Sequence, residues 1–396
     1  MRKVVAFALT LCLLCAVLSS ASAVVYEFED GRSIILAVGG SFVYARSASG
    51  TLRVWGDNQF GQLGKGYNNT ESSPNFKVAE FKSKNPQIDL SQLRDVVPAN
   101  DWSFLWMEDG ALWGVGNNSY LPLTMAEGTY STHVRVSLPE KPAAIATGFG
   151  HALALTENGE VYAWGRNSNG QVGNGGTRKT QQPYKLPLKN IVQVAAGGKF
   201  SLALDADGQL WGWGHNEFNT LSPTTAQDQY TPVKIDTGDI DIAYVDACGA
   251  SVVLLDTEGT LWTWGNNDMQ QCGYDTRGKV SPTPRAVPLP LPVTYVAAYS
   301  SQTYAILSDG SLWSWGNNSY GQLGQGFRSS STEGVLPGKC WDSDVVLVMG
   351  GSLFCIAMLK DGTVLSAGIS KFGQLGTGDA KSQYTLSPNG MNFLTD

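Results

Sequence analysis

Histidine is scarce in this chain, and so are the motifs that mark enzymes. The 396 residues contain three histidines, His133, His151 and His215, whose spacing does not match that of metal ligands. There is no Gly-x-Ser-x-Gly motif, and no Gly-Lys-Ser/Thr completes a phosphate-binding loop after Gly173. The sequence therefore predicts no catalytic residue, no metal site and no cofactor.

Basic residues are also few. The chain has 27 Lys and Arg against 34 Asp and Glu, a formal net charge of −7. Proteins that bind nucleic acid contact its phosphates through Lys and Arg, and no basic run occurs here. The charge balance therefore argues against a nucleic-acid partner.

Long hydrophobic runs are absent beyond the N-terminus. Arg2 and Lys3 precede an apolar run from Val4 to Leu18, and Ala21-Ser22-Ala23 forms a site for signal peptidase. Residues 1–23 are predicted to be a signal peptide that leaves a mature chain starting near Val24. We expect a secreted, extracellular protein of bacterial type, with no membrane span after cleavage.

Cysteine is limited as well. Six residues fall to four when the signal peptide is removed, because Cys12 and Cys15 leave with it. The remaining four, Cys248, Cys272, Cys340 and Cys355, show no CxxC spacing. Export would permit a disulfide, and Cys340–Cys355 is the pair to test first. The alternative is that these thiols are small buried hydrophobic groups.

What the chain does contain is a repeat of about fifty residues. Its anchor is a Trp-Gly dipeptide that recurs at intervals of 49 to 60 residues, with Trp replaced in two of the seven units. The seven anchors are Trp55, Val115, Trp164, Trp213, Trp264, Trp315 and Ala367. Residues 24–396 are therefore predicted to form a single domain of seven units.

Each unit has the pattern of a β-hairpin. A glycine lies five residues before each anchor residue, usually after Asp or Asn, in a tight turn that favours positive φ. The second strand of the hairpin has an aliphatic, an aromatic and a small residue before the anchor. Because side chains alternate along a strand, the aromatic residue and the anchor share one face, and the aliphatic and the small residue share the other, so neither face is polar. This pattern predicts small sheets stacked face to face, with large side chains of one against small ones of the next.

The anchor is followed by an Asn at the third place in six units, and then by a Gly-Gln-Leu-Gly segment that is complete in units one, six and seven. Units two and four lack its glycines, which predicts altered loops there. The frame Leu-Trp-x-Trp-Gly-x-Asn-x-x-Gly-Gln-Leu-Gly resembles the repeat of the regulator of chromosome condensation family over residues 33 to 396. The resemblance implies a seven-bladed β-propeller of four-stranded blades. We expect Val24 to Phe28 and the tail around Tyr384 to Phe393 to close the ring within one blade.

Two features are candidates for a binding site. The first is a ring of large side chains five residues past each anchor, where aromatic residues predominate. These could bind protein or glycan, or could pack on the neighbouring blade as part of the repeat. The candidate residues on this ring are Phe60, Tyr120, Phe218, Tyr320 and Phe372, and the two remaining units carry Asn169 and Met269.

The second candidate is an insertion within Tyr67 to Val97, which makes the first interval longer than the others. Phe81 and Lys82 lie in it, and such insertions often carry specificity. It could equally be a tolerated surface loop.

The function we predict is a non-catalytic, monomeric binding module for an extracellular or cell-surface protein. A carbohydrate-binding propeller, with a glycan as its partner, is an alternative. An enzyme with carboxylates at the mouth of the central channel is less favoured. So is a regulator that acts as an exchange factor, the role that the family's founding member has, because export and an acidic charge oppose it. The fold alone does not decide among these functions.

Overall fold

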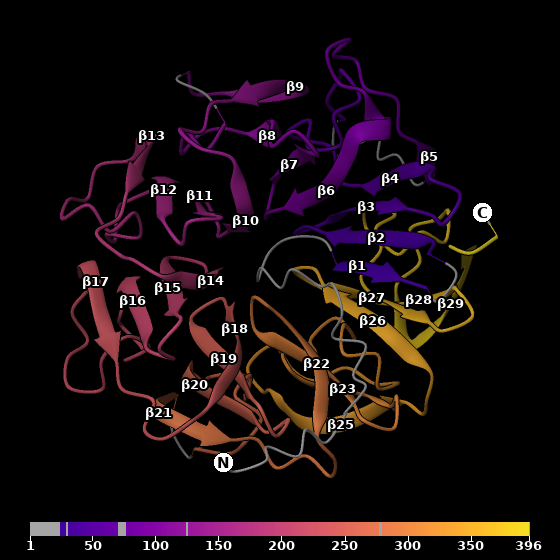
Figure 1. The fold of residues 1–396 in the computed structure, drawn as a ribbon. Coiled ribbons are helices and arrows are strands. Elements are labelled where there is room, and N and C mark those ends of the chain that lie inside the picture. Colours follow the sequence, from indigo (N-terminus) through magenta and orange to yellow (C-terminus); the bar gives the residue numbers. More distant parts are fainter. Residues whose placement is uncertain (1–23, 29–30, 70–76, 124–125, 277–278, 396) are drawn as a thin grey trace, which may run out of the picture.

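The computed structural model describes residues 24–28, 31–69, 77–123, 126–276 and 279–395. In this part of the chain, seven antiparallel sheets stand around a common axis (Figure 1). Each sheet is built from consecutive strands, with one 3-10 helix, η1 (Leu90–Gln92), between the first two. The predicted all-β, seven-bladed propeller is confirmed. The predicted signal peptide, residues 1–23, lies outside the described residues, and within those residues no helix is long and apolar enough to cross a membrane.

The chain crosses each blade from the axis outward. Apart from the extra N-terminal strand of blade 1, which is described below, the innermost strands of neighbouring blades contact each other around the ring. They are β2 (Ser33–Val38), β6 (Leu93–Pro98), β10 (Pro142–Thr147), β14 (Ile191–Ala196), β18 (Ile242–Cys248), β22 (Val293–Tyr299) and β26 (Val345–Gly350). The second strands are β3 (Phe42–Arg46), β7 (Trp102–Met107), β11 (His151–Thr156), β15 (Phe200–Asp205), β19 (Ser251–Asp256), β23 (Gln302–Leu307) and β27 (Phe354–Leu359).

The third strands carry the anchors. They are β4 (Leu52–Gly56), β8 (Leu112–Asn117), β12 (Val161–Gly165), β16 (Leu210–Gly214), β20 (Leu261–Asn266), β24 (Leu312–Gly316) and β28 (Thr363–Gly368). The outermost strands are β5 (Ala79–Glu80), β9 (Thr129–Val136), β13 (Thr180–Lys185), β17 (Gln229–Ile235), β21 (Val280–Ala286), β25 (Val335–Trp341) and β29 (Gln383–Asn392).

The strand order gives the ring two distinct faces. Because the strands are antiparallel and consecutive, the connections between first and second strands open on the same face as those between third and outermost strands. We call this the loop face. The opposite hairpin face carries the tight turns between second and third strands, together with the links to the next blade. Each turn glycine has positive φ there, between +73° at Gly159 and +90° at Gly110, as the sequence predicted.

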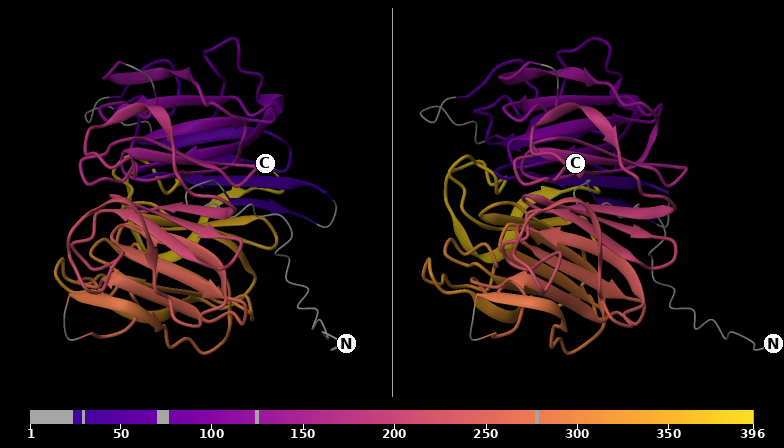
Figure 2. Two further views of the ribbon diagram at one scale, coloured as in Figure 1. Left: turned by 60° about the vertical axis from the view of Figure 1, so that its left-hand side comes forward. Right: turned by 90° about the vertical axis from the view of Figure 1, so that its left-hand side faces the viewer.

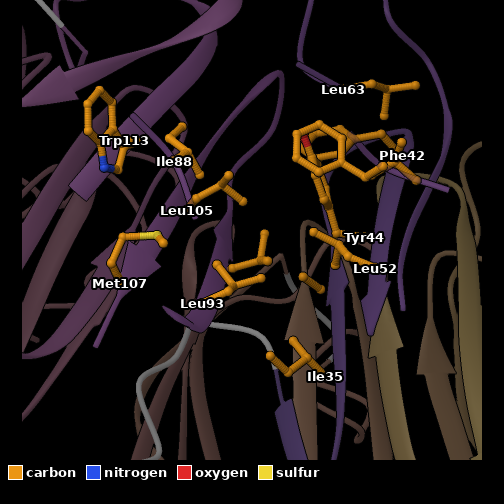
Figure 3. Packing of buried hydrophobic residues seen from close by; sticks show 14 residues of the cluster. Ile35, Phe42, Tyr44, Leu52, Leu63, Ile88, Leu93, Leu105, Met107 and Trp113 are labelled. Atoms are coloured by element: carbon orange, nitrogen blue, oxygen red, sulfur yellow. The ribbon is translucent and has the colours of Figure 1, made fainter. Parts of the chain in front are cut away.

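Packing between blades follows the predicted alternation. Trp213 of blade 4 lies in one buried cluster with Val161, Ala163 and Val172 of blade 3, so the large anchor faces a small residue of its neighbour. Figure 3 shows the corresponding cluster between blades 1 and 2, where Tyr44 and Leu105 are both buried. Burial of such side chains removes apolar surface from water on both faces of each sheet, which stabilises the stack.

Ring closure differs from the prediction in one respect. The N-terminal strand β1 (Val24–Glu27) pairs with β2 and adds a fifth strand to blade 1, whereas β29 pairs with β28 in blade 7. The two ends therefore do not share a blade, and that prediction was wrong. They lie side by side, because Tyr26 and Met391 pack on one cluster, and Phe393 O accepts a hydrogen bond from Ala48 N at 2.9 Å. Figure 2 shows blade 7 (yellow) against blade 1 (indigo).

Three cysteines are described as free thiols. Cys272 and Cys355 are buried, and Cys340 is half-buried, with its thiol donating to the carbonyl of Leu312 at 3.4 Å. The Cys340–Cys355 disulfide is not formed in this structure. Cys340 and Cys355 instead belong to the apolar packing between blades 6 and 7.

Candidate functional site

The connection between third and outermost strands has the same internal framework in most blades. The side-chain oxygen of its Asn accepts a hydrogen bond from the main chain of the apolar residue five places on, at 2.9 Å in blade 1, where Asn58 accepts from Leu63. The other five Asn residues make the same bond, at 2.7–3.0 Å: Asn118 to Leu123, Asn167 to Val172, Asn216 to Leu221, Asn267 to Cys272 and Asn318 to Leu323. Each of these apolar residues is buried.

This framework survives in the two blades that lack the glycines. In blade 2, Leu121 takes the glycine's place with φ of +66°, and in blade 4 Asn219 does so with φ of +55°. The Asn118 and Asn216 hydrogen bonds are retained in both. As far as Leu123 in blade 2 and Leu221 in blade 4, the loops therefore keep the common framework. The predicted alteration occurs in blade 4 at the second glycine position, where Ser222 N donates to Asn216 Oδ1 at 3.4 Å, whereas Gly64 N of blade 1 donates to Gly61 O at 2.8 Å.

The same connections fasten neighbouring blades to each other. The indole Nε1 of Trp213 donates to the carbonyl of Gln171 in blade 3 at 2.9 Å, which satisfies a polar atom inside the ring. Four other anchors donate to the preceding blade at 2.9–3.0 Å: Trp55 to Gln374, Trp164 to Pro122, Trp264 to Thr220 and Trp315 to Gln271. These hydrogen bonds hold each of these loops against the neighbouring blade.

The ring residues of the sequence analysis stand one to a blade and are not brought together. Tyr120 and Tyr320 are exposed, at 38% and 42%, whereas Phe60, Phe218 and Phe372 are half-buried. Several also touch other side chains: Arg166 of blade 3 lies 4.7 Å from the Tyr120 ring, and Lys371 lies 5.0 Å from that of Phe372. Residues at this position therefore contact neighbouring side chains and are also partly exposed. Among the five aromatic residues, only Tyr120 and Tyr320 are exposed rather than half-buried.

Three exposed aromatic residues lie on adjoining segments of the loop face, in blades 6 and 7. Phe327 is 47% exposed and Tyr384 is 40% exposed, beside Tyr320. Glycine at 321, with φ of +76°, allows the loop to approach, since a Cβ there would lie 2.5 Å from Cδ1 of Tyr384. Arg328 Nη1 donates to the Tyr384 hydroxyl at 3.3 Å, and its guanidinium lies over the same ring. We call Tyr320, Phe327, Arg328 and Tyr384 the aromatic patch.

Sequence reasoning found Tyr320 but missed the other members of the patch. Tyr384 comes from the outermost strand of the next blade, and no local spacing links it to Tyr320. A repeated spacing could have indicated Phe327, because an aromatic residue follows the loop Asn by nine places in blades 1 and 6. In both blades the Asn side chain donates to the carbonyl of that aromatic residue, Asn58 to Tyr67 and Asn318 to Phe327. Tyr67 is likewise 50% exposed.

Of the two candidate residues in the insertion of blade 1, one is buried and one is exposed. Phe81 is 3% exposed and packs edge-on against Tyr44 and His133, so its ring is not available to a partner. Its assignment as a binding residue is therefore withdrawn. Lys82 is exposed and lies 4.0 Å from Glu80.

Two carboxylates of the loop face, Asp57 and Asp101, lie in connections between strands. Burial raises the pKa of Asp101 on the loop face, and the charge of Asp57 raises it further, while Asn117 donates to it at 2.7 Å. Asp57 accepts from the main chain of Gln59 at 3.0 Å. Among the described residues, no group of three His, Cys, Asp or Glu could hold a metal ion. The two carboxylates thus hold their own loops.

The comparisons with known proteins agree with this architecture. A family model described as an RCC1-like domain matches residues 131–396, and a model of the regulator of chromosome condensation (RCC1) repeat matches residues 34–62. The human E3 ubiquitin-protein ligase HERC2 is 30% identical over 354 residues, which are 83% of this chain and 7% of HERC2. The chain thus spans a small part of HERC2's length.

Two further relatives match over most of both chains. The ultraviolet-B receptor UVR8 of Arabidopsis thaliana is 29% identical over 364 residues, which are 88% of this chain and 80% of UVR8. The crystal structure of Prp20p from Saccharomyces cerevisiae has a TM-score of 0.74 at 20% identity, covering 90% of this chain and 87% of Prp20p.

Proposed function

This chain belongs to the family of RCC1-like domains, and we propose that it is an exported binding protein without catalytic activity, which recognises another protein through its loop face. The aromatic patch is the observation that carries the proposal. Tyr320, Phe327 and Tyr384 present three exposed rings on adjoining segments, where single exposed rings would need no explanation.

The chemistry of the patch suits a protein partner. Aromatic residues and Arg are enriched where proteins bind one another, because they combine large apolar area with few rotatable bonds and a polar group. Arg328 is held against Tyr384, so it loses less conformational freedom when a partner binds. The Asn and Gln hydrogen bonds within the loop, such as that from Tyr320 N to Gln322 at 2.9 Å, hold the patch in place before binding.

Structures of the family offer a precedent for protein binding. Prp20p has binding properties toward Gsp1p and histones, and a second structure is of Kap60 bound to yeast RCC1. For this chain, the N-terminal segment leads us to propose an extracellular or cell-surface partner and a monomeric, secreted protein. The net charge of −7 supports a partner other than nucleic acid.

A pull-down tests the proposal. Residues 24–396 would be immobilised and exposed to secreted and surface proteins of the source cells, beside a Tyr320→Ala/Phe327→Ala/Tyr384→Ala variant. A matched control replaces Tyr184 and Tyr230, which are 41% and 45% exposed on blades 3 and 4. We expect one protein to be captured by the parent and by the control but lost from the patch variant. Capture that survives the patch variant would contradict a site at the patch.

Carbohydrate binding is the second candidate, because exposed tyrosines can also stack on sugar rings. Tyr320 and Tyr384 would serve that role as well. A glycan array probed with the parent and the patch variant separates the two functions: patch-dependent binding to a defined glycan, without capture of protein, would favour carbohydrate binding.

A further inference from the structure

A second surface lies on the hairpin face, away from the aromatic patch. The link between β17 and β18, the turn between β19 and β20 and part of β21 border an open pocket of about 690 Å³ in blade 5. Five of its lining residues are acidic: Asp236, Asp239, Asp241, Asp256 and Glu258. Trp262 and Pro284 form an apolar part of the wall, and none of the described lining residues is Lys or Arg.

In other blades, the aromatic residue equivalent to Trp262 lies beside a basic side chain. Trp262 is the aromatic residue two places before the anchor, and its counterparts in blades 2, 3 and 4 each lie beside a basic side chain of the outermost strand. The cation lies 5.7 Å from the ring for Arg135 on Trp113, 6.0 Å for Lys185 on Tyr162, and 5.4 Å for Lys234 on Trp211. In each case the basic residue pairs across the strands with the aromatic one. The aromatic position is therefore a cation-binding position of the repeat.

In two of the blades, the basic residue that pairs with the aromatic position also lies beside a carboxylate. In blade 3, Lys185 Nζ lies 2.6 Å from Glu160, and the Tyr162 hydroxyl donates to Glu140 at 2.8 Å. In blade 6, Lys339 is the cross-strand partner of Trp313, and its Nζ lies 2.8 Å from Asp342. In blade 3 the basic side chain thus lies between an aromatic ring and a carboxylate.

Blade 5 has the ring and the carboxylates but a different cross-strand residue. The cross-strand partner of Trp262 is Ala286, which is exposed. The neighbouring basic residue, Arg285, lies over the ring of Tyr274 instead, at 4.5 Å. The basic side chain that accompanies the aromatic position in other blades is therefore replaced here by a methyl group.

The indole of blade 5 is oriented by its own hydrogen bond. Trp262 Nε1 donates to Asp256 Oδ2 at 2.9 Å. The same bond joins Trp211 to Asp205 in blade 4, where Lys234 lies over the ring. Blade 5 therefore has the ring geometry of blade 4, with more negative charge around it and alanine in place of the lysine.

We propose that this pocket binds a lysine or arginine side chain presented by an exposed segment of another protein. The side chain would approach the face of Trp262 in the place that Lys234 takes on Trp211. Its charge would lie among Asp236, Asp239, Asp241 and Glu258. This surface is independent of the proposed loop-face function, because the pocket and the aromatic patch lie on opposite faces of the ring.

The pocket can be tested with one peptide. The probe is a fluorescein-labelled Gly-Lys-Gly-Lys-Gly-Lys-Gly peptide, with its lysine-acetylated form as control, titrated against the full chain at low salt and followed by anisotropy. Ala286→Lys supplies a basic residue from the chain itself, as blades 3 and 4 do, and Ala286→Gln is its neutral counterpart. Position 286 is exposed, so neither substitution disturbs the core.

We expect saturable binding of the lysine peptide, little binding of the acetylated one, and a loss of roughly tenfold in affinity for Ala286→Lys but not for Ala286→Gln. Asp239→Asn/Asp241→Asn should weaken binding similarly. Neutralising two turn carboxylates of other blades, with Asp109→Asn/Asp361→Asn, should change affinity by less than about twofold, as distant charges are screened. Equal binding by Ala286→Lys and Ala286→Gln, or an equal loss in the Asp109/Asp361 control, would overturn the proposal.

Discussion

The hydroxyl of Tyr304 donates to the main-chain carbonyl of Gln322 at 2.9 Å, within blade 6. At five other junctions, the corresponding carbonyl is bound by the anchor Trp of the next blade, as Trp213 binds Gln171. Blade 7 has Ala367 at its anchor and cannot make that bond. Tyr304 thus supplies from inside blade 6 the donor that blade 7 lacks.

A tyrosine hydroxyl also replaces the indole as donor at the only other anchor that is not Trp. Blade 2 has Val115, and the Tyr44 hydroxyl of blade 1 donates to the carbonyl of Gln62 at 3.0 Å. The counterparts of Tyr44 and Tyr304 in the other five blades have no hydroxyl: Phe104, Leu153, Leu202, Val253 and Ile356. The two tyrosines therefore occur in those blades whose neighbour lacks the indole, because a buried carbonyl left without a donor is costly.

Removing this hydroxyl should destabilise the ring. We expect Tyr304→Phe to lower the free energy of unfolding by about 1–3 kcal/mol, since Gln322 O would lose its donor while the ring volume is kept. Chemical denaturation followed by near-UV circular dichroism measures the change. Tyr320→Phe, at an exposed position, is the control and should be neutral. A Tyr304→Phe midpoint equal to that of the parent would contradict the role given to this bond.

Relieving strain in the blade 2 loop should stabilise the protein. Leu121 has a φ of +66°, a conformation that disfavours a side chain with a Cβ, and glycine occupies this place in four other blades. Leu121→Gly is expected to raise the free energy of unfolding by about 1 kcal/mol, less the stabilisation that this half-buried side chain gains from its partial burial. Thermal melts of the variant and of Leu121→Ala, which keeps a Cβ, measure it. Equal melting temperatures would show that strain at this residue is small.

Stability should fall as the pH rises from about 5 to 9. Burial raises the pKa of Asp95 to about 8, although Val96 N, Arg94 and Arg46 favour its charged form. The unfolded carboxyl has a pKa near 4, so between about pH 4 and 8 the folded state binds more protons and loses stability with each added pH unit. Urea midpoints at pH 5 and pH 9 measure the fall, and Asp95→Asn should show a smaller one. A fall of unchanged size in Asp95→Asn would assign it to other groups.

The described thiols should be unreactive in the folded protein. Burial raises the pKa of Cys272 and of Cys340 to about 12, and it raises that of Cys355 as well. Because the thiolate is the reactive form, iodoacetamide at about pH 8 should leave all three unmodified until the protein is unfolded. Peptide mapping by mass spectrometry measures the modification. A Cys340–Cys355 disulfide in a non-reducing map of exported protein would contradict this expectation.

The exported protein should begin at Val24. Cleavage after Ala23 would leave β1 intact, with its four residues still paired to Ser33–Leu36. N-terminal sequencing of protein recovered from the extracellular fraction checks both the site and the compartment. A first residue inside β1, or intact residues 1–23 on protein retained in the cell, would contradict the predicted signal peptide.

Much of the fold could be predicted from the sequence because every repeat carries the same local patterns. The turn glycine before each third strand, the alternation of Trp262 and Trp264 with Leu261 and Thr263, and the Asn that holds each loop are local patterns that recur about every fifty residues. Each of the seven small sheets is apolar on both faces, and a closed ring covers both faces of every sheet with its two neighbours. The blade count and the buried third strand were therefore predictable from spacing alone.

What only the tertiary structure decided depends on contacts between blades. Phe81 is aromatic and lies in an insertion, yet its position against Tyr44 and His133 buries it. Tyr384 joins Tyr320 only because blade 7 follows blade 6 around the ring, and the acidic residues of blade 5 surround Trp262 only once their links are folded. A repeat specifies the residues that each blade shares. The surfaces that distinguish one member of the family from another arise where unlike residues of neighbouring blades meet, and no spacing within one repeat encodes that.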